Sequence, residues 1–287
     1  LFGRQIWRKV SMRWPAAEEL RQQLGYGLPL IFTFALAWVI SGSDRLLLAW
    51  LLDEDAVGHY SAGYDLVFQS LTLLLTIINT AAYPLAVKAM EHGGEAQARK
   101  QLADNGELIM AAALAGAAGL VVLAPAIVTL FIGEAFRPGT AAILPIVAAA
   151  SALSGIKAYH FDMAFHLGKR SRTLVWITAL AAVVNVILNL LWIPLMGIAG
   201  AAWATLAAYA IALVTSAAVG CRVFSMPPGW MLIVKGTLVA CAVALSAGLA
   251  KKIGLSGAWV LPVGVLGGAI SGVVTMFAIK TIGSRGS

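Results

Sequence analysis

Long apolar runs recur along this chain, and they constrain its fold more than any other feature. A run of about 20 apolar residues can cross the hydrocarbon core as an α-helix, whereas a membrane β-barrel shows short alternating segments instead. The sequence therefore predicts an all-α, polytopic membrane helix bundle of about eight transmembrane helices. The predicted spans are roughly 27–51, 57–88, 103–132, 139–167, 173–193, 198–221, 231–250 and 258–280.

The composition agrees with a membrane protein. Hydrophobic residues make up 60% of the chain and charged residues 11%, against roughly 25% charged residues in an ordinary globular domain. The net charge of +7 does not indicate a nucleic-acid partner, because the basic residues lie between the apolar spans. Cys221 and Cys241 fall near or within apolar helices, where cysteines are typical of inert packing residues rather than of a disulfide or a metal site.

The basic residues also predict an orientation. If the N-terminus is placed in the cytoplasm, fifteen Lys and Arg residues lie on the cytoplasmic side, three lie outside and two lie within spans. Because cytoplasmic loops are enriched in Lys and Arg, we expect a multi-pass protein of the bacterial inner membrane with both termini cytoplasmic. Residues 1–25 are basic and lack a secretory signal, so they form either an interfacial helix on anionic lipid or a solvated linker.

Polar side chains inside the spans mark a candidate transport path. Those of the second span recur three or four positions apart, which keeps them on one helical face. A polar face along a membrane helix turns to water or to other protein, so the stripe lines either a water-filled cavity or a hydrogen-bonded seam between helices. The stripe consists of Ser61, Asp65, Gln69, Thr72, Thr76, Asn79 and Tyr83.

The first span holds two adjacent charges, Asp44 and Arg45. On an α-helix they diverge by about 100°, and a charge at the membrane centre costs roughly 2.5–3.5 kcal/mol on insertion scales. We therefore expect each to meet a partner on another helix, and Asp65 is the candidate partner of Arg45. Two interpretations stay open: a structural ion pair near the outer membrane face, or a cationic site for a phosphate.

The fourth span carries Lys157, His160, Asp162 and His166. Helical spacing places the first two on one face and the last two nearly opposite, so the four do not form a zinc site. We expect Asp162 and His166 to form a solvated pair near the cytoplasmic end. Lys157 lies deeper, where it is either a cation in the cavity or a side chain that snorkels toward the interface.

The segment from Val184 to Tyr209 predicts a tight helical hairpin. Pro194 favours ending the first helix just before it, and Gly197 permits the reversal. Asn185 and Asn189 lie one turn apart on one face of this apolar helix. Two amides in such surroundings need polar partners, so we expect them either to join the polar interior or to form a packing hydrogen bond.

Three patterns in the chain carry a family resemblance. The hairpin contains N-x3-N-x2-W-I-P-L-x-G-I-x-G-A-A-x-A-T-x3-Y, and upstream lie S-G-S-D-R-L-L-L at 41–48 and V-G-H-Y-S-A-G-Y-D-L at 57–66. These patterns resemble Wzx-like lipid-linked oligosaccharide flippases of the multidrug/oligosaccharidyl-lipid/polysaccharide exporter superfamily. The resemblance covers only the second half of such a transporter. It implies a basic cytoplasmic or interfacial linker (1–25), a six-helix second lobe (26–224) and two accessory C-terminal transmembrane helices (225–287).

The resemblance also implies a function. The expected substrate is an oligosaccharide on a polyprenyl pyrophosphate, moved across the inner membrane by alternating access, with Arg45 and Lys157 meeting the pyrophosphate. The energy would come from an ion gradient acting through Asp44 or Asp65, or from downstream consumption of the glycan. The candidate cavity residues are Arg45, Lys157, Asp44, Asp65, Gln69, Thr72, Thr76, Asn79, Asn185 and Asn189.

Other functions remain as alternatives. A multidrug or cation antiporter of the same superfamily would favour an acidic, aromatic cavity, whereas the deep charges here are of both signs. A membrane-embedded glycan-assembly enzyme would be expected to carry large extramembrane loops, and the outside loops are short. A non-transporting scaffold would not need the polar stripe. The chain has no G-K-[ST] phosphate loop and no readable Ser–His–Asp arrangement, so we expect no catalytic residue, metal or cofactor.

The expected partners are the lipid-linked substrate, membrane lipids and a second lobe. The working unit of such flippases has two lobes, and this chain matches one. We therefore expect either a missing N-terminal lobe, which the start at Leu1 rather than Met also indicates, or a second copy of the chain. A glycan polymerase is a further candidate partner.

Overall fold

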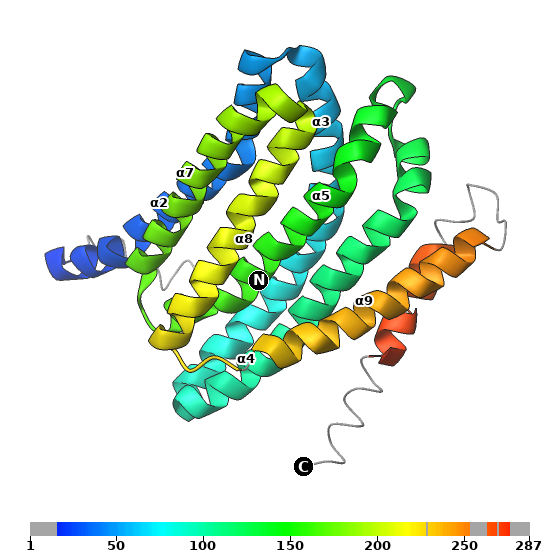
Figure 1. Cartoon of the computed structure of the whole chain (residues 1–287). Coiled ribbons are helices and arrows are strands. Elements are labelled where there is room, and N and C mark those ends of the chain that lie inside the picture. Colours follow the sequence, from blue (N-terminus) through cyan, green and yellow to red (C-terminus); the bar gives the residue numbers. More distant parts are fainter. Residues whose placement is uncertain (1–15, 228, 253–262, 269, 276–287) are drawn as a thin grey trace, which may run out of the picture.

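The computed structural model describes residues 16–227, 229–252, 263–268 and 270–275, and these form a bundle of long helices (Figure 1). The helices are α2 (Ala17–Leu51), α3 (Glu54–Val67), the π-helix η1 (Phe68–Thr72), α4 (Leu73–Phe131), the 3₁₀ turn η2 (Glu134–Phe136), α5 (Arg137–Ile156), the π-helix η3 (Lys157–Phe161), α6 (Met163–Leu167), α7 (Ser171–Met196), α8 (Ile198–Val223) and α9 (Gly229–Lys252). The predicted all-α polytopic class is confirmed, because six helical stretches are long and apolar enough to cross a membrane.

One of these stretches contains two predicted spans. The stretch Glu54–Phe131 is reversed inside α4 at Gly94, whose φ of 67° and ψ of −162° lie outside the helical region. Glycine adopts this backbone conformation without the steric cost that a Cβ atom would add. The second predicted span, 57–88, therefore corresponds to α3 (Glu54–Val67), η1 (Phe68–Thr72) and the first arm of α4, and the third span lies in the second arm, 95–131. Helix replaces the predicted loop between the two spans.

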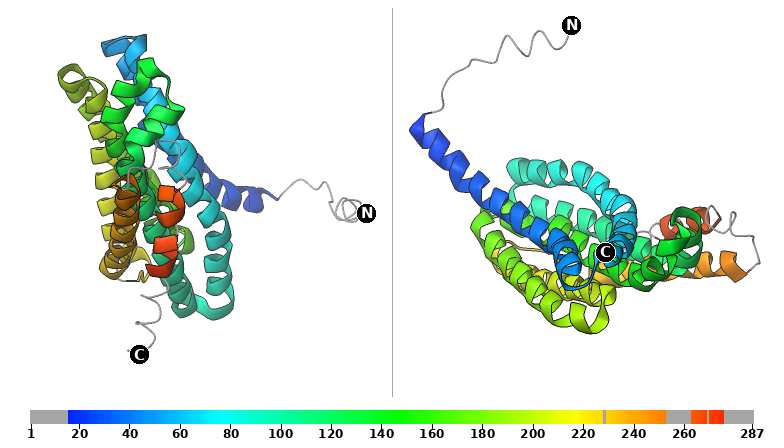
Figure 2. Two further views of the ribbon diagram at one scale, coloured as in Figure 1. Left: turned by 90° about the vertical axis from the view of Figure 1, so that its right-hand side faces the viewer. Right: turned by 90° about the horizontal axis from the view of Figure 1, so that it is seen from above.

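The first and last predicted spans differ from the helices that the structure describes at the two ends of the chain. α2 begins at Ala17, ahead of the predicted start at 27, and Glu19 accepts a hydrogen bond from the Ala16 backbone N–H at 3.1 Å. The N-terminal part of α2 leaves the bundle (Figure 2). Of the predicted last span, Val263–Thr275 is a short apolar helix, and the rest lies outside the described residues, as do residues 1–15.

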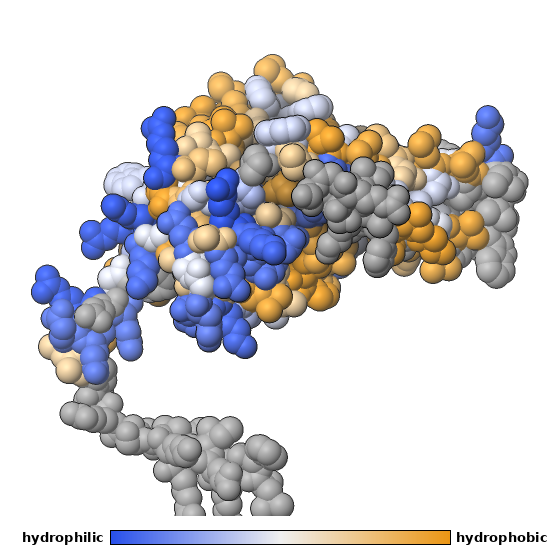
Figure 3. All heavy atoms as spheres, turned by 90° about the horizontal axis from the view of Figure 1, so that it is seen from below, coloured by the Kyte–Doolittle hydropathy of each residue, from blue (hydrophilic) through white to orange (hydrophobic). Residues whose placement is uncertain are grey.

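The core lies where α3, α4, α5 and α8 meet. Tyr60, Leu75, Met110, Ile143 and Ala201 are fully buried in one cluster there. The outer surface carries large apolar side chains, as a helix bundle in lipid requires. α9 packs along the second arm of α4, to one side of the other helices (Figure 1). Seen from the end at which α4 reverses, hydrophilic side chains gather over the bundle (Figure 3).

The predicted hairpin between α7 and α8 is confirmed, with one correction. Gly197 makes the reversal at a φ of 61°, but α7 continues to Met196, so Pro194 lies within its last turn rather than ending it. The Gly197 N–H still bonds to the Ile193 carbonyl at 2.8 Å, so the last turn closes despite the missing proline N–H. α8 then runs back against α7.

Gly200 sets how closely the two helices of this hairpin approach. A Cβ atom at position 200 would lie 2.3 Å from the Trp192 carbonyl oxygen, which is backbone and cannot rotate away. We expect Gly200→Ala to destabilise the protein by about 1–3 kcal/mol, seen as a lower melting temperature in detergent. The control is Gly133→Ala, whose Cβ would meet open space. Equal melting temperatures for the two variants would contradict this account of the hairpin.

Candidate functional site

A polar groove runs along the bundle through three adjoining cavities. The largest, of about 470 Å³, lies among α2, α4, α5, η3, α6, α7 and α8. A second, of about 180 Å³, shares Ala37, Ser154 and Tyr209 with it. A third, of about 390 Å³, shares Tyr64 and Phe68 with the second and contains Arg45. The groove therefore joins a site at Arg45 to a deeper site at Lys157. Its polar lining includes Thr33, Ser41, Asp65, Thr72, Asn79, Tyr83, Ser151, Ser154, Tyr159, Asp162, His166, Thr178, Thr205 and Tyr209.

The deep site is an ion pair made by a π-helical turn. Lys157 Nζ lies 2.7 Å from Asp162 Oδ2, and both side chains are at most 10% exposed. Ser216 donates to Asp162 Oδ1 at 2.5 Å. Asp162 and Lys157 meet because η3 closes with the Asp162 N–H bonded to the Lys157 carbonyl, five residues back, at 2.9 Å. In an α-helix the same two residues would be about 140° apart.

This geometry overturns two predictions about the fourth span. Lys157 and Asp162 share a face instead of lying nearly opposite, and Asp162 is buried, so the solvated setting predicted for it and His166 is wrong. The His166 ring is half-buried and stands edge-on to the Tyr83 ring, with centroids 6.2 Å apart. Lys157 points into the protein, so it does not snorkel, and it lines the groove as a cation.

The shallow site is the predicted pair of Arg45 with Asp65. Arg45 Nη2 lies 2.5 Å from Asp65 Oδ1, and the side chains are 36% and 58% exposed. The guanidinium also lies over the Tyr64 ring, 5.6 Å from its centroid. Its Nε is buried without a hydrogen-bond partner. This half-open pair is weaker than the buried one, since water screens exposed charges.

Asp44 turns away from Arg45 into a closed network behind the groove. Its carboxylate accepts hydrogen bonds from the Tyr60 hydroxyl at 2.5 Å, Asn189 Nδ2 at 2.6 Å and the Thr205 hydroxyl at 2.6 Å. Asn185 accepts from Asn189 at 3.2 Å. The prediction that the two amides find polar partners is confirmed. The four side chains of this network besides Asp44 are nearly or fully buried: Tyr60, Asn185, Asn189 and Thr205. Of these four, Thr205 also lines the groove.

The polar stripe of the second span is divided between cavity and seam. Thr72 bonds to Ser151 at 2.7 Å and Thr76 to Tyr159 at 2.9 Å, which is the seam that the sequence left open as one alternative. Asn79 lines the deep cavity. Gln69 is exposed. The residues of the stripe therefore do not all face the same surroundings. The π-helix η1, at 68–72, shifts the helical register within the stripe, so residues before and after it point in different directions.

The sequence analysis missed the contribution of α8. Thr205, Tyr209 and Ser216 lie along one side of this helix and meet Asp44, the groove and Asp162 in turn. Their spacing of four and seven residues is a helical repeat, so the signal was present. They are sparse polar residues in a helix of mostly alanine and other apolar residues, which made that signal weak.

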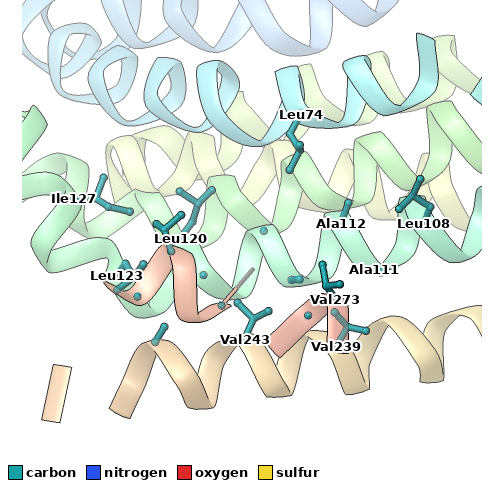
Figure 4. Close-up of a pocket in the computed structure, with 18 residues that line it drawn as sticks. Leu74, Leu108, Ala111, Ala112, Leu120, Leu123, Ile127, Val239, Val243 and Val273 are labelled. Carbon is teal, nitrogen blue, oxygen red and sulfur yellow. The ribbon is translucent and has the colours of Figure 1, made fainter. Parts of the chain in front are cut away.

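A separate, wholly apolar pocket of about 470 Å³ lies between the second arm of α4 and α9 (Figure 4). Leu74 and Leu120 of α4 face Val239 and Val243 of α9 across it, and Val273 closes one side. Its lining has no charged side chain among the described residues, so it differs in chemistry from the groove.

Comparison with known proteins agrees with this architecture. The profile of a family described as "Polysaccharide biosynthesis protein" matches residues 5–141. Four chains of solved structures also match significantly. One of them, "Lipid II flippase MurJ, inward closed conformation", is 15% identical, with a TM-score of 0.73 over 98% of this chain and 60% of its own. No curated protein sequence matches the chain significantly. The structural match shows that this chain has the fold of that flippase, and the chain spans about 60% of the MurJ chain.

Breaking the deep ion pair on one side should destabilise the fold. Lys157→Met leaves the Asp162 carboxylate buried and uncompensated, which costs about 3–5 kcal/mol. Adding Asp162→Leu removes both charges and should restore most of the lost melting temperature in detergent. If the double variant melts as low as the single one, the pair is not a compensated buried ion pair.

Proposed function

We propose that this chain is one lobe of a flippase for a polyprenyl-pyrophosphate-linked oligosaccharide, acting in a bacterial inner membrane by alternating access. The observation that carries the proposal is a polar groove with a cation at two depths inside an apolar helix bundle. A glycan headgroup cannot cross hydrocarbon unaided, because each buried polar group without a hydrogen bond costs several kcal/mol. The flippase fold and the polysaccharide family profile support the same class of substrate.

In this proposal the two cations bind the pyrophosphate in succession. Arg45 is held by a half-exposed carboxylate, so it can exchange Asp65 for a phosphate oxygen at little cost. Lys157 is held more tightly by a buried carboxylate. Hydroxyl and amide groups between them, from Asn79, Tyr159 and Tyr209, offer hydrogen bonds to sugar hydroxyls. The lipid tail stays in the bilayer.

The distribution of charge supports a cytoplasmic location for the end of the bundle at which α4 reverses. Hydrophilic side chains gather there (Figure 3), and the exposed basic residues at that end include Lys88, Arg99, Lys100, Lys169 and Arg170. Because Lys and Arg are retained on the cytoplasmic side, we place the N-terminus of α2 in the cytoplasm. Lys157 then lies on the cytoplasmic side of Arg45 along the groove.

A second lobe completes the proposed cavity. The chain spans about 60% of the length of the MurJ structure. We propose that an N-terminal lobe, or a second copy of this chain, covers the open side of the groove. A multidrug or cation antiporter is the rival function. A cationic substrate would need a free carboxylate, and both carboxylates in the described lining of the groove, Asp65 and Asp162, are already paired with its cations.

Arg45 is the residue on which the proposal is most directly tested. In the complete transporter, Arg45→Ala should abolish glycan export while membrane levels stay normal, because the phosphate loses the outer of its two proposed cations. Arg45→Lys should retain part of the export, since it keeps the charge and loses the guanidinium fork. The control is Lys100→Ala, an exposed cation outside the groove. Export at the wild-type rate by Arg45→Ala would remove the phosphate role.

Energy coupling is proposed at Asp44. Its network offers oxygen atoms of the kind that hard cations prefer, and Asn189 Oδ1 is buried there with no hydrogen-bond partner among the described residues. A monovalent cation such as Na⁺ fits this set of ligands. The other candidate is Asp65, which is already paired with Arg45.

Melting curves with and without Na⁺ separate these candidates. At 100 times its Kd, a bound ion stabilises the folded state by about 2.7 kcal/mol. We expect Na⁺, but not choline, to raise the melting temperature of the wild type and of Asp65→Asn, and not that of Asp44→Asn. Loss of the effect in Asp65→Asn alone would move the site to Asp65. A wild type without any Na⁺ effect would leave glycan consumption as the source of energy.

A further inference from the structure

A cleft of about 290 Å³ lies between α2 and α7, outside the groove and independent of the proposed transport path. Its walls are apolar, and its rim carries one charge. Leu24, Leu28 and Phe32 come from α2, and Arg172, Val175 and Trp176 come from α7. The groove uses other residues of the same two helices, so the packed seam between α2 and α7 has a different site on each side.

The charges of this cleft gather at one end. Arg172 is in the first turn of α7, and Arg21 is near the start of α2, on the same helical stripe as Leu24 and Leu28. Both arginines are exposed, and neither has a hydrogen bond or an ion pair within the part of the chain that the structure describes. Lys169 and Arg170 precede α7 and are exposed too. This end therefore attracts an anion.

Beyond the arginines the cleft is open and apolar. Trp176 is 77% exposed and Phe32 is 55% exposed. A Cβ atom added at Gly25, in the cleft wall, would meet nothing within 4 Å. Tryptophan is enriched where headgroups meet hydrocarbon. The cleft thus presents cations at the headgroup level and an apolar trough directly beneath them.

We propose that this cleft binds an anionic phospholipid of the surrounding bilayer, such as phosphatidylglycerol. Its phosphate pairs with Arg172 and Arg21, and one acyl chain lies along Leu28 and Phe32. A free phosphate would use the charges but not the apolar trough, and an uncharged lipid would use only the trough. The bound lipid packs against the seam between α2 and α7, at the level where α2 leaves the bundle (Figure 2).

Native mass spectrometry of the purified protein in mild detergent tests this site. The protein is titrated with phosphatidylglycerol or with phosphatidylcholine of the same acyl chains. We expect selective retention of phosphatidylglycerol, weakened about fivefold by Arg172→Ala and by Arg21→Ala. Gly25→Leu should weaken it without any change of charge, because its side chain fills the trough. The matched control is Arg99→Ala, an exposed arginine elsewhere at the same end.

Three outcomes would overturn the proposal. The first is equal retention of the two lipids by the wild type, and the second is a loss in Arg99→Ala as large as that in Arg172→Ala. The third is displacement of the lipid by inorganic phosphate at millimolar concentration, which would identify a site for a free anion. If Arg172→Ala or Arg21→Ala does not give a monodisperse protein, two other variants still test the site. Gly25→Leu should lose the bound phosphatidylglycerol, and Arg172→Lys, which keeps the charge, should retain it.

Discussion

A membrane interior offers no water to a polar group, and the rest of this structure depends on that constraint. Each buried polar side chain must find its partner within the protein or face a solvated space between helices. Asp44 takes the first course and collects three donors from α3, α7 and α8. Arg45, the next residue, takes the second and lies in the groove. Two adjacent charges on one helix thus serve two different sites, a closed network behind the groove and the groove itself.

The two π-helical turns decide what the groove contains. η3 brings Lys157 and Asp162 onto one face, where an α-helix would hold them about 140° apart. η1 interrupts the helical stretch that carries the polar stripe, and it shifts the register of that stripe between a cavity and a seam. π-Turns frequently occur at functional sites because they re-aim side chains at the cost of weaker backbone geometry.

The described surfaces of the bundle differ in chemistry. The groove is polar and holds charges of both signs. The pocket between α4 and α9 is apolar throughout its described lining. The cleft between α2 and α7 combines cations with an apolar trough.

The sequence by itself determined the class of fold, most of the spans, the hairpin at Gly197 and the pairing of Arg45 with Asp65. Each rests on local physics: the length of an apolar run, the freedom of a glycine, or the cost of a lone charge in lipid. Only the tertiary structure decided the partner of Lys157 and the burial of Asp44. A π-turn has no sequence signature that α-helical spacing can detect, and a carboxylate becomes a closed network only when three other helices supply its donors.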